Sequence, residues 1–269
     1  MPITRAVISL DGSTLRNASR PWGERPLDVG DGALAEHGVA GEVLGDAFRM
    51  PDAQALFAAP PSHPPRILLL YGSAGSRAYS RLLTQEAGAL LETLGAQVRI
   101  FEPLGLPLPD DAAADHPRVA ELRALSAWSE GQVWCSPESN GAMTAILKAQ
   151  IDWLPLPIAT GAAQLTQGKT LALMQISGGL QTFNAVDQMR ILAQRMGMIA
   201  IPSQCSVAEA FNAFEDEGRM KPSPSYDRVV DLMEELVKFT LLTRGASACL
   251  TDHYSVRKDA LAEKSPAGR

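Results

Sequence analysis

RILLLYGSAGSRAYS, at residues 66–80, is the stretch of sequence that decides the fold. Its first half is an apolar run without polar alternation, which is typical of a parallel strand buried on both faces. A loop of glycine, serine and alanine follows, and after Ser80 apolar residues recur at helical spacing as far as Leu94. This order of elements brings main-chain N–H groups and the positive end of a helix dipole to one point, which suits a phosphate. An ordinary tight turn between a strand and a helix would show the same pattern.

The length, composition and charge of the chain indicate a globular protein: it has 269 residues, 46% of them apolar, and a net charge of −6. That length allows one large α/β domain with an extension, or two small domains. Lys and Arg are not concentrated in any stretch, which argues against a nucleic-acid binder. The three cysteines lie far apart without metal-ligand spacing, so we expect no metal site and a reducing, cytoplasmic compartment. No apolar run approaches the ~20 residues of a membrane span, and we expect no signal peptide.

From Arg66 onward, strand-like apolar runs alternate with amphipathic segments of helix length. The strands predicted after the first one are residues 97–101, 132–135, 170–177 and 197–201. The helices predicted after the first one are residues 117–129, 142–153, 182–196 and 224–243. Five strands separated by helical crossovers predict a doubly wound parallel α/β sheet with helices on both faces. This pattern favours the flavodoxin-like order 2-1-3-4-5, with a ligand at the carboxyl ends near strands one and three.

The two ends of the chain predict less regular structure. Residues 1–60 are rich in Gly, Ala, Asp and Pro, and we interpret them as an N-terminal extended arm. The arm is predicted to be partly disordered or to pack on a neighbouring subunit. The flavodoxin-like domain is predicted over residues 61–257, and residues 258–269 are predicted to be a disordered tail.

Three loops of similar composition follow the first, third and fourth predicted strands. They are residues 72–80, 136–143 and 177–184. Each loop is small and polar and contains glycine, which lets the backbone approach a planar ligand closely. Because the three strands are neighbours in the predicted sheet, their loops should form one site.

Several further runs carry a family resemblance: residues 128–138, 148–153, 167–172, 183–186, 218–223 and the closing helix at 226–240. They resemble the ArsH family of arsenic-resistance flavoproteins, which belongs to the NADPH-dependent FMN reductases. The resemblance covers roughly residues 55–257. It implies a flavodoxin-like fold, FMN as cofactor, NADPH as hydride donor and a homotetramer with its sites at subunit interfaces. It also implies a small-molecule electron acceptor: a quinone, an azo dye, oxygen or a trivalent organoarsenical.

On this resemblance, the three loops are the FMN site. The predicted phosphate contacts are Ser73, Ser76, Arg77, Tyr79 and Ser80. The predicted contacts of the flavin ring are Pro137, Glu138, Asn140, Gly141, Ser177, Gly178 and Gly179. Because the cofactor itself carries the hydride, no catalytic side chain is predicted.

The first loop departs from the family pattern Gly-Ser-x-Arg-x-x-Ser, in which the arginine and the second serine hold the FMN phosphate. Gly75 and Ala78 stand at those two positions. Losing one charge-assisted hydrogen bond to a phosphate removes about 1.5–3 kcal/mol, so we expect weaker FMN binding than is usual in the family. Two alternatives stay open: a flavodoxin-like electron carrier, and a non-enzymatic relative with weakened or lost FMN binding.

Cys135 ends the third predicted strand, close to the expected ring position. It is a candidate thiol ligand for an arsenical. A lone cysteine in a strand usually packs as a small apolar residue, so we favour a buried structural role.

Overall fold

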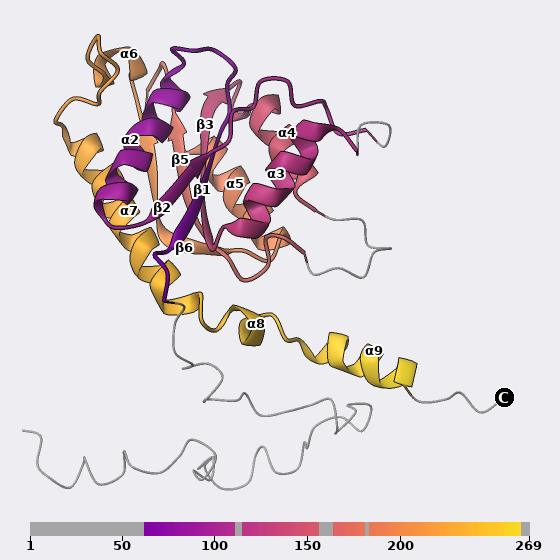
Figure 1. Ribbon diagram of the computed structural model, residues 1–269. Coiled ribbons are helices and arrows are strands. Elements are labelled where there is room, and N and C mark those ends of the chain that lie inside the picture. Colours follow the sequence, from indigo (N-terminus) through magenta and orange to yellow (C-terminus); the bar gives the residue numbers. More distant parts are fainter. Residues whose placement is uncertain (1–61, 111–114, 156–163, 181–182, 265–269) are drawn as a thin grey trace, which may run out of the picture. The chain divides into compact units, whose positions relative to one another are not determined.

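The computed structural model describes residues 62–110, 115–155, 164–180 and 183–264 (Figure 1). Five strands run parallel in the order β2-β1-β3-β5-β6, and a two-residue strand, β4, pairs antiparallel with β3. The strands are β1 (Arg66–Tyr71), β2 (Gln97–Ile100), β3 (Gly131–Ser139), β4 (Ala142–Met143), β5 (Thr170–Ile176) and β6 (Ile199–Val207). Counted over the parallel strands, this is the order 2-1-3-4-5, so the predicted flavodoxin-like α/β fold is confirmed.

Helices cover both faces of this sheet (Figure 1). The helices are α2 (Tyr79–Thr93), α3 (Pro117–Trp128), α4 (Ala145–Trp153), α5 (Asn184–Arg195), α6 (Ala210–Ala213), α7 (Pro224–Thr243), α8 (Ser247–Leu250) and α9 (Tyr254–Lys264). Apolar residues of α2 and α7 form one core cluster with the sheet, and those of α3, α4 and α5 form a second. The sheet is therefore doubly wound, as predicted.

The first strand, β1, is buried on both of its faces. Ile67 and Leu69 belong to the cluster with α2 and α7, whereas Leu68 and Leu70 belong to the cluster with α3, α4 and α5. All four side chains are fully buried. Because each face meets a helical layer, the strand has a continuous apolar sequence instead of an alternating one.

The amino end of β3 leaves no room for a side chain. A Cβ built on Gly131 would lie 2.6 Å from Oγ1 of Thr170 and 2.8 Å from Oγ1 of Thr240. These two hydroxyl oxygens lie 2.6 Å apart and join β5 to α7 by a buried hydrogen bond. The absence of a side chain at Gly131 thus lets α7 lie close against the sheet.

The predicted boundaries around the end of β3 are wrong. β3 extends past its predicted end to Ser139, and α4 begins at Ala145 instead of Ala142. A tight hairpin lies between them, with Asn140 at φ 51° and Gly141 at φ 75°. An Asn-Gly pair favours such a two-residue turn because both residues tolerate positive φ.

The last strand, β6, also runs beyond its predicted end at residue 201. Pro202 lies within the strand, where the register with β5 shifts between Leu171 and Leu173. β6 is an edge strand, and proline is tolerated at an edge or a bulge because it lacks the N–H that a central strand must donate. The strand therefore continues through the proline.

The predictions for the two ends of the chain have different outcomes. Residues 258–264 belong to the helix α9, so the predicted disordered tail is wrong over that part, and residues 265–269 lie outside the described residues. The predicted arm at residues 1–60 also lies outside them. Gln54–Asp252 form one compact unit, to which α9 does not belong. Within the described ranges, no helix is both long enough and apolar enough to cross a bilayer.

Replacing Gly131 by alanine places a methyl group where Thr170, Thr240 and Ile67 leave no space. We expect this overpacking to lower the free energy of unfolding by about 1–3 kcal/mol, as measured by urea denaturation. Gly75→Ala is the control, because its added Cβ would meet no atom closer than 3.6 Å. Equal stability of the two variants would show that α7 can move away from β3 at little cost.

Candidate functional site

The loops after β1 and β3 are joined at the carboxyl edge of the sheet. The N–H of Gly72 donates to the carbonyl of Cys135 over 2.9 Å, and the Thr144 hydroxyl donates to the carbonyl of Gly72 over 2.7 Å. A Cβ on Gly72 would lie only 2.5 Å from the Thr144 oxygen, so glycine is required for this contact. Thr144 is also the N-cap of α4 and accepts from the N–H of Leu147. One threonine therefore positions both the first loop and a helix of the site.

The first loop brings hydroxyl groups and main-chain donors together. Ser80 is 1% exposed and donates to Oγ of Ser73 over 3.0 Å. Ala78 is the N-cap of α2 and provides no side-chain acceptor for the N–H groups of the first turn. These N–H groups point along the positive end of the helix dipole, where an anion is stabilised. The loop fits a phosphate, and the assignment of Ser73 and Ser80 to it stays a prediction.

Two other predicted phosphate contacts have partners in a different segment. Nη2 of Arg77 donates to the carbonyl of Asp216 over 2.9 Å. The ring of Tyr79 stacks on Phe214 with 5.8 Å between centroids. Both partners lie between α6 and α7, so Arg77 and Tyr79 hold this segment beside the first loop. Their contact with a phosphate is not tested by these interactions and stays a prediction.

The same segment is fixed to α2 by a carboxylate that is 2% exposed. Glu86 accepts from Nε and Nη2 of Arg219 over 2.8 and 2.9 Å, and more weakly from the N–H of Met220 over 3.4 Å. The hydrogen bonds from Arg219 lower the pKa of Glu86 and outweigh the effect of burial, which raises it. The charged form of Glu86 therefore stabilises the folded chain next to the first loop.

The second predicted loop is the hairpin of β3 and β4. Pro137 pairs with Ile176 of β5, and Asn140 and Gly141 form the exposed turn. Gln188 of α5 donates from Nε2 to the carbonyl of Gly141 over 3.1 Å. The hairpin is thus held at its base by the sheet and at its tip by α5.

A polar network connects this hairpin to β5. Nε2 of Gln175, a fully buried residue, donates to Glu138 over 2.8 Å, while its Oε1 accepts from the N–H of Val186 over 3.0 Å. Asn184, at the start of α5, donates to the other carboxylate oxygen of Glu138 over 3.3 Å. The predicted site residue Glu138 is therefore oriented by β5 and α5 together.

The third predicted loop, after β5, is held against the end of β6. Ser177 donates from its N–H to Val207 over 2.9 Å, and its carbonyl accepts from the N–H of Ala210 over 2.9 Å. Gly179 donates to Oγ of Ser177 over 3.1 Å. A Cβ on Gly178 would meet no described atom within 4 Å, so this backbone faces open space. The structure thus brings all three predicted loops to one edge of the sheet.

Cys135 is not a reactive thiol. Its side chain has no exposed surface, and burial raises its pKa to about 12. Because the thiolate is the form that binds metals and metalloids, the thiol is poorly suited to hold an arsenical. The interpretation of Cys135 as a small buried residue is confirmed.

Sequence reasoning did not identify Thr144 or Gln175 as part of this site, and it placed Asn184 in the third loop without giving it a contact. A threonine immediately before a helix is an N-cap signal, and this signal could have identified Thr144. A glutamine within an otherwise apolar strand indicates a buried hydrogen-bonding role, which could have identified Gln175. No signal in the sequence pairs Asn184 with Glu138, because that contact depends on the packing of α5.

Comparisons with known proteins agree with this geometry. A family model described as NADPH-dependent FMN reductase matches residues 65–212. An NADPH-dependent FMN reductase ArsH from Rhizobium meliloti is 64% identical over 80% of this chain and 89% of its own length. A protein of the same name from Acidithiobacillus ferrooxidans is 61% identical, over 81% of this chain and 92% of its own.

Solved structures show the same fold at lower identity. The flavoenzyme FerB, an NAD(P)H:acceptor oxidoreductase from Paracoccus denitrificans, superposes with a TM-score of 0.56 at 18% identity. The superposition covers 65% of this chain and 97% of FerB. At this identity the likeness supports the fold alone.

Replacing Glu86 by glutamine should change how stability depends on pH. Because the folded-state pKa lies below the ordinary glutamate value of 4.5, ionised Glu86 stabilises the protein above that pH, and this stabilisation is lost as the pH falls through the folded pKa. At pH 7 we expect E86Q to lose about 1–2 kcal/mol in urea unfolding, and the difference from the parent should shrink towards pH 3.

Glu234→Gln is the control for this variant, since Glu234 forms an exposed helical ion pair with Lys238. Such pairs contribute little, so this substitution should leave the stability almost unchanged. A difference between E86Q and the parent that stayed constant from pH 7 to pH 3 would contradict the assigned role of the charge.

Proposed function

We infer that this chain, which belongs to the NADPH-dependent FMN reductase family and to its ArsH group, passes hydride from NADPH to FMN and onward to a small acceptor. The observation that carries this function is the meeting of three loops at the carboxyl edge of the sheet, next to the amino end of α2. Relatives named as ArsH reductases, at 58–64% identity, favour this function over an electron carrier or a non-enzymatic protein.

The donors of the first loop fit the FMN phosphate. The Ser73 and Ser80 hydroxyls lie 3.0 Å apart at the start of α2, and the N-cap residue Ala78 adds no side-chain hydrogen bond there. Two hydroxyls and free helix N–H groups are the donor set that a phosphate dianion requires. These two serines and the first turn of α2 would hold the phosphate end of the cofactor.

The other two loops would hold the ring end. Their exposed backbone at Gly141 and Gly178 lacks side chains that would block a planar group, and the hydrogen bonds to Glu138 and Ser177 fix their positions. Bound FMN supplies the hydride-transfer chemistry. The residues of this chain would bind and orient the cofactor, and main-chain N–H groups would stabilise developing negative charge on it. No described side chain is assigned to acid, base or nucleophilic chemistry.

The acceptor is proposed from the ArsH group: a quinone, an azo dye, oxygen or a trivalent organoarsenical, with a role in arsenic resistance. Exposed apolar side chains near the third loop, Leu180 at 83% and Phe211 at 57% exposure, favour an acceptor with an apolar surface. Buried Cys135 gives the arsenical no thiol to bind, so an arsenical would react at the cofactor without prior attachment to this cysteine.

Titration of the FMN-free protein with FMN, followed by flavin fluorescence, tests this function directly. We expect saturable binding and, after addition of NADPH in air, sustained oxidation of NADPH measured at its absorbance band. Binding without NADPH oxidation would indicate an electron carrier. No binding at high micromolar FMN would exclude the proposed cofactor.

The variant Ala78→Ser tests, in the same titration, whether position 78 contacts the cofactor. A serine at this N-cap adds a hydroxyl beside the first turn of α2, and we expect FMN to bind about tenfold more tightly. Ala74→Ser adds the same hydroxyl at an exposed position of the same loop that does not cap the helix, and should leave the affinity unchanged. Equal affinities in all three proteins would show that position 78 does not contact the cofactor.

We also propose a homotetramer located in the cytoplasm. Exposed Leu104, Leu108 and Ile146 line a hollow of about 240 Å³ together with Ala74 of the first loop, which favours a subunit contact beside the site. Light scattering of the purified protein should give four times the chain mass, and a monomer mass would contradict the assembly.

The cytoplasmic location is supported by the cysteines. All three cysteines are free, which suits a reducing compartment. Cell fractionation tests the compartment.

A further inference from the structure

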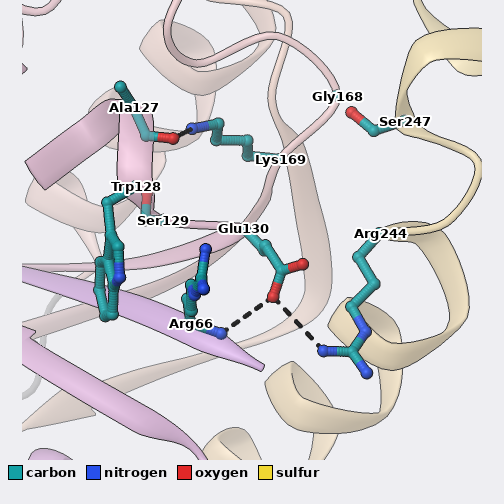
Figure 2. Close-up of a pocket in the computed structure, with 9 residues that line it drawn as sticks. All are labelled: Arg66, Ala127, Trp128, Ser129, Glu130, Gly168, Lys169, Arg244 and Ser247. Carbon is teal, nitrogen blue, oxygen red and sulfur yellow. Dashed lines mark hydrogen bonds and ion pairs between the residues drawn. The ribbon is translucent and has the colours of Figure 1, made fainter. Parts of the chain in front are cut away.

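A second cavity lies at the amino edge of the sheet, opposite to the three loops. It has a volume of about 230 Å³ and is formed where β1, β3 and β5 begin (Figure 2). Arg66 is the first residue of β1, whereas Glu130 and Lys169 immediately precede β3 and β5. The six residues of β1 span about 20 Å at ~3.3 Å per residue, so the cavity is separate from the proposed FMN site.

Basic side chains outnumber acidic ones in the lining of this cavity. Arg66, Lys169 and Arg244 line it together with a single carboxylate, that of Glu130. Glu130 accepts from the main-chain N–H of Arg66 over 3.0 Å and forms an ion pair of 3.4 Å with Arg244, which is 6% exposed (Figure 2). One carboxylate thus faces three cations, in a chain whose net charge is −6.

Lys169 is a half-buried cation with only neutral hydrogen-bond partners in the described part of the chain. Its Nζ donates to the main-chain carbonyls of Ser126 and, over 3.4 Å, of Ala127. Burial lowers the pKa of Lys169 from 10.5 to about 8, and the charge of nearby Glu130 only partly opposes this shift. Burying an ammonium group without a counter-charge is costly, so an anion in the cavity would stabilise it.

Arg66 is a second cation without a carboxylate partner among the described residues. Its Nε is buried without a hydrogen-bond partner there, and its guanidinium carbon lies 6.0 Å from the ring centroid of Trp128. The indole of Trp128 also lines this cavity. A guanidinium presents several N–H donors in one plane, which suits the oxygens of an oxyanion.

We propose that this cavity is a binding site for a small dianionic oxyanion, held between the side chains of Arg66 and Lys169. The volume equals that of about eight water molecules at ~30 Å³ each, which admits a sulfate, a phosphate or a compact carboxylate. The cavity lies at the amino edge of the sheet, whereas the proposed FMN site lies at the carboxyl edge. The proposal therefore does not depend on the proposed function. Phosphate and carboxylate ligands share this chemistry, and the experiment below distinguishes them.

The binding should weaken as Lys169 loses its proton. The other charged or titratable groups around it are Arg66, Glu130, Arg244 and His63, whose Nε2 lies 3.7 Å from a Glu130 oxygen. Burial lowers the pKa of Lys169 to about 8, within the pH range of this titration. The affinity for an anion of constant charge should therefore fall between pH 7 and pH 9.

Calorimetric titration of the FMN-saturated protein with sodium sulfate tests the site, with ionic strength held constant by sodium chloride. Saturation with FMN fills the phosphate loop, and sulfate keeps its charge across pH 7–9. We expect one saturable site whose affinity falls over that range. Lys169→Met should weaken binding about tenfold or more and remove the pH dependence. Titration with phosphate and with citrate at pH 7.5 shows which oxyanion the cavity prefers.

Lys238→Met is the matched control, because Lys238 is 71% exposed and pairs with Glu234 away from the cavity. This variant should bind sulfate as the parent does. If K169M fails to fold, Arg66→Gln is the second variant, and it too should weaken binding. The absence of a saturable site, or equal affinity in the parent and in the cavity variant that folds, would overturn the proposal. If the protein does not bind FMN, the same comparison of variants still reports on this cavity alone.

Discussion

The register of the three central strands fixes the position of every loop in the candidate site. Tyr71 of β1 pairs with Cys135 of β3, and Pro137 of β3 pairs with Ile176 of β5, so the strands end at neighbouring points of one edge. A shift of one residue would turn each buried side chain to the opposite face. Such a shift would also move Gly131 and Gly72 away from positions where any side chain would overlap a threonine, so the close packing of the core determines where the loops meet.

Hydrogen bonds of buried polar groups then hold in place the loops that the strand register brings together. Gln175 lies next to the carboxyl end of β5, and its two amide atoms are used by Glu138 and by the N–H of Val186. Thr144 connects the first loop to α4 in a similar way. Leaving such groups unpaired costs about 1–3 kcal/mol each, so these contacts hold the loops in one arrangement before any ligand binds.

The two edges of the sheet differ in their chemistry. The carboxyl edge offers glycine backbone, serine hydroxyls and a helix amino end, which are neutral donors suited to close approach. The amino edge offers charged side chains around a cavity, including Lys169 and Arg66 without a carboxylate partner among the described residues. Both arrangements favour anions, but the first uses dipoles and the second uses net charge.

The sequence by itself determined the parallel strands and the three small-residue loops at their carboxyl ends, because buried parallel strands and their turns carry strong local patterns. It also gave the family, through runs that include the loop after β3. Only the tertiary structure decided that Arg77 and Tyr79 contact the segment before α7, and that Glu138 is held by Gln175 and Asn184. It alone revealed the charged cavity at the amino edge. These contacts join residues far apart in the chain, and their geometry follows from how the helices pack on the sheet, which no local pattern records.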